Sequence, residues 1–380
     1  MDLLWRHRDG LAYGMGHGKV VGRPHRRHLR CDQRDNRNGR DTCRDSPHSL
    51  WLAGTASRFS GPVLIFSGPD DLAVLALAVL LDLTLGEPPT RFHPTVWMGR
   101  HISFVERWSP KKGFIGLMAG LSIALVLPAI WGGEAFFLAF WLQDVHSIVY
   151  ILVGAVLLKS TFSLRMLHKE AALVRGHLDR GDMEQVRARM PSLVSRDPSG
   201  LTAEQATAAT VESVSENIND SFLAPWLFFA LFGLPGAFAY RMINTLDSMI
   251  GYRGVYEYLG KASARLDDLV NLVPARLAGL LLVAASGFLP GQQMARAWRI
   301  MWRHHGRTQS PNAGWTMSGM AGALGVQLQK VDPELGYTLG EPDRPIEPSD
   351  ISRAVQSMYL VGFFGLTIAL VITLARGTIF

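Results

Sequence analysis

Apolar stretches as long as a membrane-spanning helix leave this chain few ways to fold. They cover residues 72–85, extended backwards through Val63–Phe66, and residues 114–131, 135–158, 274–289 and 355–374. A helix needs about 20 mostly apolar residues to cross the hydrocarbon core of a bilayer. Hydrophobic residues make up 48% of the chain and charged residues only 18%, which is typical of a membrane protein with sizeable polar loops. The sequence therefore predicts an all-α, polytopic helical membrane protein that includes amphipathic helices.

The net charge of +6 belongs to one terminal segment. Residues 1–60 contain twelve Lys and Arg against six Asp, so their excess equals that of the whole chain. This segment has too little apolar periodicity to offset the entropy of ordering it. We therefore predict a disordered basic extension over residues 1–65, interpret it as a mis-assigned start, and assign the integral-membrane domain to residues 66–380. No nucleic-acid partner is predicted.

Basic residues and helix breakers together suggest a topology. Lys and Arg concentrate in loops 86–112, 159–221 and 291–354, which predicts that these loops share the cytoplasmic side. The Gly132-Gly133 pair is expected to form a turn between two spans. The apolar stretch 222–240 is broken by Pro225 and by GLPG at 233–236. We favour a re-entrant hairpin here, because a full crossing would carry the next polar segment to the opposite side.

That next polar segment runs from Tyr240 to Arg276 between two apolar stretches. On a helix, Asn244, Asp247 and Ser248 share one face, and the Arg-x-x-Asp pattern at 265–268 repeats this spacing. Charged side chains near hydrocarbon need partners, because unpaired charge there is costly. One reading is a set of ion pairs that hold membrane helices together. The other is a polar site for an anionic, metal-bound ligand.

A second candidate site lies on the helix predicted to begin after Thr202, where Gln205 completes a capping box. Glu212 and Glu216 lie one turn apart on this helix, and Asp220 follows one turn later. Carboxylates in this arrangement could bind Mg²⁺. The alternative is a solvated acidic face. Residues 200–220 contain no Lys or Arg, which favours the metal site over an ion-paired surface.

Five motifs in order resemble the membrane-bound adenosylcobinamide-phosphate synthases of cobalamin biosynthesis. The resemblance runs from about residue 70 to the C-terminus, and its departures are small; Glu87, for example, stands where Asp is commoner. The matching stretches are LLDLTLGEPPTRFHPTVWMGR (80–100), SRDPSGLTAEQATAATVESVSENINDSFLAPW (195–226), AYRMINTLDSMIGYR (239–253), ARLDDLVNLVPARL (264–277) and SPNAGWTMSGMAGALGV (310–326).

The resemblance implies an enzyme of the cell (inner) membrane that forms an amide at the expense of ATP. It joins adenosylcobyric acid, a corrinoid substrate rather than a cofactor, to (R)-1-aminopropan-2-ol or its O-phosphate. The implied cofactors are ATP and Mg²⁺. The implied partners are the lipid bilayer and other membrane-bound enzymes of cobalamin biosynthesis. The active site is expected to face the cytoplasm and to draw on polar regions 159–221, 241–276 and 291–354.

Residue chemistry at the matching motif positions assigns roles. General-base or Mg²⁺ binding roles are expected for Glu212, Glu216, Asp247 and Asp268. Binding of substrate and phosphate groups is expected from His93, Arg196, Asn217, Arg241, Asn244, Ser248, Arg253, Arg265, Asn271 and Asn312. His93 in particular is expected to shape the entrance of the pocket.

A non-catalytic membrane carrier or scaffold for corrinoid intermediates is the alternative from another class. Broken helices and charged residues within the membrane are found in transporters too. The two halves of this chain show no repeat, which argues against a transporter. ATP-dependent product formation by the purified protein would separate the enzyme from the carrier.

Overall fold

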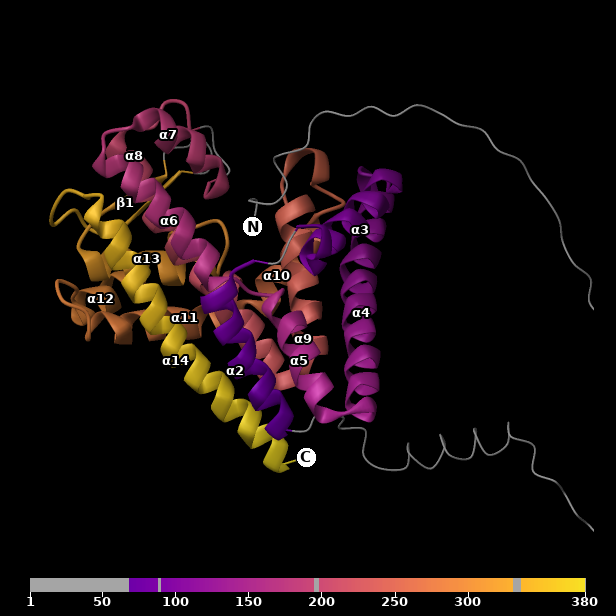
Figure 1. The fold of residues 1–380 in the computed structure, drawn as a ribbon. Helices are drawn as coiled ribbons and strands as arrows, with labels where there is room; N and C mark the ends of the chain where they lie inside the picture. Colours follow the sequence, from indigo (N-terminus) through magenta and orange to yellow (C-terminus); the bar gives the residue numbers. More distant parts are fainter. Residues whose placement is uncertain (1–67, 88–89, 195–197, 331–335, 380) are drawn as a thin grey trace, which may run out of the picture. The chain divides into compact units, whose positions relative to one another are not determined.

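The computed structural model describes residues 68–87, 90–194, 198–330 and 336–379 (Figure 1). These residues are predominantly helical, which confirms the predicted fold class, whereas the extension over residues 1–65 and Arg196 lie outside them. The longer helices are α2 (Gly68–Leu85), α3 (Pro94–Trp108), α4 (Gly113–Val145), α5 (Ser147–Lys159), α6 (Leu164–Asp179), α7 (Met183–Arg189), α8 (Ala203–Ile218), α9 (Ala224–Ile250), α10 (Lys261–Val270), α11 (Leu272–Ser286), α12 (Met294–His304), α13 (Ala313–Leu324) and α14 (Ser349–Ile379). The remaining elements are the 3-10 turns η3 (Thr90–Phe92), η4 (Met190–Ser192), η6 (Gly254–Tyr256) and η7 (His305–Arg307), the π-helix η5 (Asn219–Leu223), and the strands β1 (Leu328–Lys330) and β2 (Tyr337–Leu339).

Several helical segments have the length and composition of membrane spans. Within the described residues there are four, namely Gly113–Val145, Ser147–Asp179, Ala203–Ile250 and Ser349–Thr378. The pair α10 and α11, bent by 49°, would make a fifth. Helix α2 covers the first predicted span but is not among the four, because three Asp residues lie within its 18 residues. The set is compatible with a multi-pass membrane protein.

The turn predicted at Gly132-Gly133 is wrong. Both glycines lie inside α4, and the chain breaks instead at His146, where Nδ1 accepts a hydrogen bond of 3.1 Å from the backbone N–H of Ile148. A Cβ atom on Gly132 would come within 3.3 Å of the Ala239 Cβ on α9. A glycine costs only about 1 kcal/mol in a helix, so close packing against α9 outweighs its weak helix propensity.

The re-entrant hairpin favoured from the sequence corresponds to a sharp break inside α9. Gly233 has φ 66° and ψ −158°, a conformation open to glycine and almost closed to other residues. The rings of Phe228 and Tyr240 stack 5.0 Å apart, whereas twelve residues of straight helix would separate them by about 18 Å. The two halves of α9 therefore fold back on each other as a helical hairpin.

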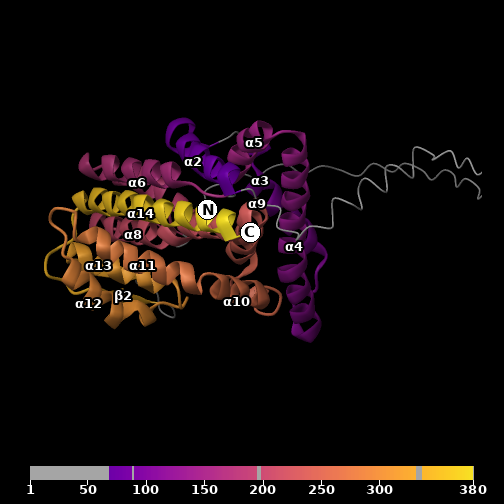
Figure 2. The ribbon, with the colours of Figure 1, turned by 90° about the horizontal axis from the view of Figure 1, so that it is seen from below.

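Helix α8 lies in the interior of the helical body. It packs against α6, α13 and α14, while α2 packs against α5 and α14 and α4 packs against α9. Helix α4 stands at one edge, and the paired helices α12 and α13 lie toward the opposite edge (Figures 1 and 2). All residues of α8 from Ala206 to Ser215 are buried, Glu212 among them, whereas Glu216 is exposed, so the acidic pair does not form one open surface face.

Hydrogen bonds cap the N-terminus of α8 and form a strand pair that packs on this helix. The predicted capping box is present: Thr202 Oγ1 accepts from the Gln205 N–H at 3.2 Å, and Gln205 Oε1 accepts from the Thr202 N–H at 3.0 Å. Strands β1 and β2 pair antiparallel inside the segment predicted as a polar loop, with Gln329 opposite Thr338. Because β1 packs on α8, this pair brings Lys330 and Tyr337 next to the acidic helix.

Candidate functional site

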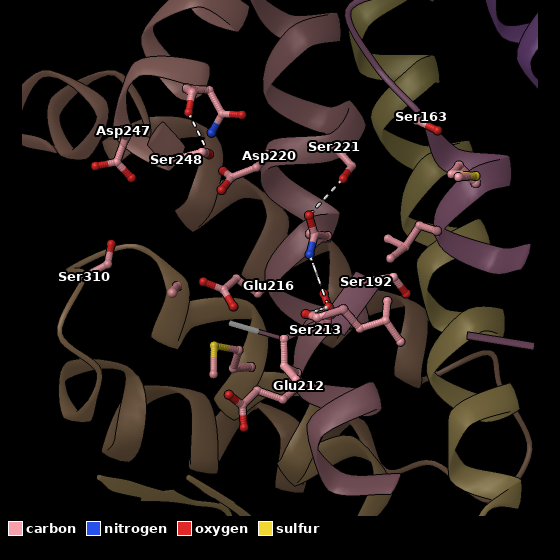
Figure 3. A pocket seen from close by; sticks show the side chains of 18 of the residues that line it. Ser163, Ser192, Glu212, Ser213, Glu216, Asp220, Ser221, Asp247, Ser248 and Ser310 are labelled. Atoms are coloured by element: carbon pink, nitrogen blue, oxygen red, sulfur yellow. Dashed lines mark hydrogen bonds between the residues drawn. The ribbon is translucent and has the colours of Figure 1, made fainter. Parts of the chain in front are cut away.

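A cavity of about 600 Å³, here the first cavity, lies between α8, α9 and the segments before α3 and α13 (Figure 3). Its apolar lining includes Phe162, Met166, Leu167 and Met317. Ligand sites usually combine such apolar surface with a few placed polar groups, and this cavity adds many charged and hydroxyl side chains to its apolar lining. Its charged and amide residues are Glu87, His93, Glu212, Glu216, Asn217, Asp220, Arg241, Asn244, Asp247, Gln309 and Lys330, and its hydroxyl residues include Ser160, Ser163, Ser192, Ser213, Ser221, Ser248, Ser310 and Tyr337.

Four carboxylates form one side of the first cavity, here the acidic wall: Glu212, Glu216, Asp220 and Asp247. Figure 3 shows Glu216, Asp220 and Asp247 turned toward the same space. Glu212 is 8% exposed and accepts a hydrogen bond from the Tyr337 hydroxyl, whereas Glu216 is exposed to the cavity. So many like charges in one pocket favour a ligand that brings positive charge.

The acidic wall depends on a local change of helix type. Glu212 and Glu216 lie one turn apart on α8, as expected for residues four apart. The π-helix η5 follows directly and carries Asp220, which accepts 2.7 Å from the Asn219 amide. π-helical turns within α-helices are frequent at functional sites, because the extra residue redirects the side chains.

Asn271 joins η5 to the hairpin and to α10. Its Oδ1 accepts from Asn219 Nδ2 at 2.7 Å and from the Tyr240 hydroxyl at 2.9 Å, and its Nδ2 donates to Asp267 at 3.0 Å. Asn271 is 1% exposed and lines neither cavity described here. It therefore positions the wall and makes no contact with the cavity space.

The predicted polar face of 240–250 is present at the end of α9. Arg241 Nη1 donates to Asn244 Oδ1 at 3.0 Å, and its Nε donates to the carbonyl of Thr161. Ser248 donates to the Asn244 carbonyl at 2.9 Å. Arg241 is only 2% exposed, so its guanidinium presents a fixed positive charge beside the acidic wall.

Asp247 owes its place to the glycine that follows one turn later. A Cβ atom at Gly251 would come within 2.0 Å of Asp247 Oδ1, so a larger residue would displace the carboxylate. The Gly251 N–H closes the helix on the Asp247 carbonyl at 2.8 Å. Asp247 and Gly251 line the first cavity and also a neighbouring one.

This second cavity has a volume of about 500 Å³ and lies beside α10. Arg253, Lys261 and Arg265 line it and are exposed, and Asp267 and Asp268 lie on its α10 side. Arg265 Nη1 is 3.8 Å from Asp268 Oδ2, a distance at which an exposed ion pair contributes little. The side chains that the two cavities share are those of Asp247, Tyr252, Gln309 and Ser310.

A third group of charges lies on the side of the first cavity formed by the segment after α2. His93 Nε2 is 3.0 Å from Glu87 Oε2, and Lys159 Nζ is 2.8 Å from Glu87 Oε1 and 3.2 Å from Asp82 Oδ1. Burial raises the pKa of Glu87, but the hydrogen bond with His93 and the Lys159 ammonium outweigh it and lower the pKa to about 2. Glu87 is therefore ionised at neutral pH.

Comparison with known proteins identifies the family. The model of the family "CobD/Cbib protein" matches residues 75–358, which is most of the chain. The chain belongs to the CobD/Cbib family. The cobalamin biosynthesis protein CobD of Dehalococcoides mccartyi is 48% identical over 283 residues, which cover 74% of this chain and 90% of that protein. A probable CobD of Methanothermobacter thermautotrophicus is 40% identical over 289 residues (75% and 92%), and CobD of Geobacter metallireducens 38% over 293 residues (76% and 92%). No solved structure matches the chain.

Most residues predicted for the site of this CobD/Cbib protein come together. The first cavity is lined by His93, Glu212, Glu216, Asn217, Arg241, Asn244, Asp247 and Ser248. The second cavity is lined by Asp247, Arg253, Arg265 and Asp268. Asn312 lines neither of them: its Nδ2 donates 2.8 Å to the carbonyl of Asp268, and its Oδ1 accepts from Arg276. Asn312 therefore holds α13 against the end of α10.

Sequence reasoning missed several residues of the cavities. Glu87 lines the first cavity and is paired with Lys159, which lines neither cavity. Neither residue gave a periodic signal, because Glu87 follows the end of α2, Lys159 ends α5, and the two meet only in three dimensions. Lys330 and Tyr337 lie in a segment that read as an irregular loop. Lys261 is the first residue of α10 and lines the second cavity, and no helical spacing links it to the predicted polar face. Asp220, predicted as a third carboxylate after Glu212 and Glu216, lies on the acidic wall with both of them.

Proposed function

We propose that this chain is an adenosylcobinamide-phosphate synthase. It would join a carboxylate of adenosylcobyric acid to the amine of (R)-1-aminopropan-2-ol or of its O-phosphate, with hydrolysis of ATP. Membership of the CobD/Cbib family supports a role in cobalamin biosynthesis, since the relatives are named for that pathway. The amide-forming reaction itself rests on the resemblance of five motifs and on the chemistry of the two cavities.

The observation that carries the proposal is Asp247 at the junction of the first cavity and a second cavity in which three exposed cations, Arg253, Lys261 and Arg265, lie beside three further carboxylates (Glu257, Asp267 and Asp268). A carboxylate is a poor acyl donor, and its phosphorylation gives a mixed anhydride that an amine can attack. Such a reaction needs a place for an ammonium group next to a place for phosphates. The acidic wall suits the first, and Arg253, Lys261 and Arg265 suit the second.

The donor groups also fit Mg²⁺, for which we propose Glu212, Glu216, Asp247 and Asp268. Among the described residues, no three His, Cys, Asp or Glu side chains form a ready-made metal site. Mg²⁺ usually binds through one or two carboxylates, waters and substrate phosphates, so such a closed site is not required. When bound, the ion would offset the negative charge of the phosphates. Arg241, Asn217, Asn244 and Ser248 would orient the substrate around it.

The full chain purified in detergent provides the direct test. It would be incubated with adenosylcobyric acid, aminopropanol O-phosphate, ATP and Mg²⁺, and the product mass and ADP would be followed. Parallel reactions with free aminopropanol would decide which acceptor is used. An amide product that requires ATP would support the synthase. If intact protein formed no product at any ATP and amine concentration, the proposed synthase activity would be wrong.

Replacing Asp247 is the sharpest variant for this site. Asp247→Asn keeps the shape and removes the charge shared by both cavities, so we expect kcat to fall by about 100-fold or more. Asp179→Asn is the matched control, because Asp179 lies on α6 with its side chain 51% exposed. It should change kcat less than twofold. Full activity in Asp247→Asn would exclude this carboxylate from the chemistry.

A carrier or scaffold for corrinoids is the second candidate, and the hairpin in α9 favours it. Broken helices that line a polar cavity are common in transporters. Tight corrinoid binding with no ATP turnover in the same assay would support this function instead. For either function we propose a multi-pass protein of the cell membrane with its cavities on the cytoplasmic side, on the basis of the basic loops.

A further inference from the structure

Four ionisable residues form one connected group at the first cavity, here the His93 cluster: Asp82, Glu87, His93 and Lys159. Asp82 Oδ2 accepts from the backbone N–H groups of Leu164 at 3.1 Å and Arg165 at 3.0 Å, which fixes the carboxylate at the first turn of α6. Lys159 is 4% exposed and bridges Asp82 to Glu87. Lys159 thus fixes Oε1 of Glu87, which leaves Oε2 to accept the hydrogen bond from His93.

The contact with Glu87 selects the tautomer of the neutral His93 ring. An ionised carboxylate can only accept hydrogen bonds, so Nε2 must carry the hydrogen that faces Glu87 Oε2 at 3.0 Å. A neutral imidazole has a single N–H, so Nδ1 carries a lone pair. This tautomer is assigned from the hydrogen bond.

His93 Nδ1 has no hydrogen-bond partner in the described part of the chain. The ring is 6% exposed, and a buried nitrogen left in this way costs free energy. A histidine that only supports the core would ordinarily use both nitrogens. His93 uses Nε2 for Glu87, and the residue lines the first cavity, an arrangement found in catalytic pairs of a base and its orienting carboxylate. Nδ1 itself is buried, so the ring has to shift before this nitrogen can meet a substrate in the cavity.

We propose that His93, oriented by Glu87, is the general base that deprotonates the amine substrate. This inference rests on the proposed function. The N–H bond of the ammonium breaks, the electron pair stays on the amine nitrogen, and the proton bonds to Nδ1. The amine then forms the C–N bond with the acyl phosphate. The C–O bond breaks, and phosphate leaves with that electron pair and the second amine proton. The imidazolium releases its proton to water.

The charges around His93 are consistent with this role. The carboxylate of Glu87 stabilises the imidazolium form of His93. Lys159 contacts the other oxygen of Glu87, and the positive charge of Lys159 is offset by the carboxylate of Asp82. On α9, which packs against α3, Arg241 and Asp247 are the charged residues that line the same cavity. The acidic wall faces this space too and would attract the ammonium group that His93 must deprotonate.

Rates as a function of pH test the proposal on the full chain. We expect His93→Gln to lower kcat for amide formation by about 10²–10⁴-fold at pH 7. The loss should shrink about tenfold per pH unit as pH rises, because the substrate amine then loses its proton without a base. Glu87→Gln should show a smaller loss with the same trend, and Glu87→Asp should retain most activity. His101→Gln is the matched control, since His101 lies on α3 against the Trp131 ring, outside both cavities.

The outcomes distinguish a failure of the base assignment to His93 from a failure of the proposed synthase function. An active wild-type protein whose His93→Gln variant loses less than threefold, or loses the same factor at every pH, would overturn the base assignment alone. A wild-type protein that forms no amide would overturn the proposed function and the base together. If His93→Gln fails to fold, as judged by thermal unfolding in detergent, the Glu87→Gln and Glu87→Asp pair gives the same pH readout.

Discussion

Two buried clusters of charge begin on the same helix and differ in what surrounds them. The His93 cluster starts at Asp82, near the end of α2. The second, here the Asp71 cluster, starts eleven residues earlier and contains Asp71, Tyr150 and Arg376. Asp71 accepts from the Tyr150 hydroxyl with one oxygen and from Arg376 with the other, and Arg376 also donates to the Phe229 carbonyl at 3.1 Å.

The difference separates structural charge from charge available for chemistry. Asp71 and Tyr150 are fully buried, both carboxylate oxygens have partners, and neither cavity reaches them. The Asp71 cluster therefore ties α2, α5, α9 and α14 together. In the His93 cluster, by contrast, Glu87 and His93 line a cavity, and one ring nitrogen has no partner in the described residues. Burial and pairing are common to both clusters, so the cavity beside the His93 cluster is the feature that indicates function.

The largest effect is expected from breaking the Asp71 cluster. Arg376→Met leaves a carboxylate buried without its counter-charge, so we expect unfolding in detergent to require about 3–5 kcal/mol less free energy. The double variant Asp71→Leu/Arg376→Met removes both charges and should recover most of that loss. Amide formation per folded molecule should stay within twofold of the wild type in both.

Two results would break the comparison. A loss below about 1 kcal/mol in Arg376→Met would mean that the pair does not hold the helices together. A folded double variant with strongly reduced kcat would mean that the Asp71 cluster acts on the site, although neither cavity reaches it.

The sequence could predict the elements of this fold but not the pairing of its charges. Composition and helical spacing led to the apolar helices, to the capping box at Thr202 and to the acidic pair on α8, because these depend on residues three or four apart. Asp71 and Arg376 lie 305 residues apart, and no local pattern links them. The same holds for Glu87 and Lys159.

The error in the fold and the places of two predicted site residues have physical causes of the same kind. Gly132-Gly133 read as a turn because local propensity disfavours helix there, but the packing of Gly132 against α9 decided otherwise. Asn271 and Asn312 were expected to contact substrate because they are polar residues in matching motifs. The structure uses their amides for hydrogen bonds that position η5 and α13. Residue type could indicate a polar neighbourhood but not which side of a helix faces the cavity.

A smaller effect is expected from Tyr150→Phe, which removes one hydrogen bond and leaves the Asp71–Arg376 ion pair in place. A hydrogen bond to a charged group contributes about 1.5–3 kcal/mol, so the loss of stability should fall below that of Arg376→Met. Tyr258→Phe is the matched control, because Tyr258 is 46% exposed. Equal losses in Tyr150→Phe and Arg376→Met would mean that the hydroxyl, and not the ion pair, dominates the Asp71 cluster.

The smallest effect concerns Glu87 and appears only in acid. Its pKa is about 2 in the folded protein, below the ordinary 4.5, so the ionised form is favoured by folding. The stability that this carboxylate contributes is complete above about pH 4.5 and is lost as pH falls toward 2. Its side chain is 25% exposed, so water screens part of the interaction. The difference in melting temperature between the wild type and Glu87→Gln should therefore shrink from pH 5 to pH 2. A difference that stays constant over this window would show that Glu87 is held by shape rather than by charge. The carboxylate would then have no means of fixing the His93 tautomer, and the contrast between the two clusters would lose its basis.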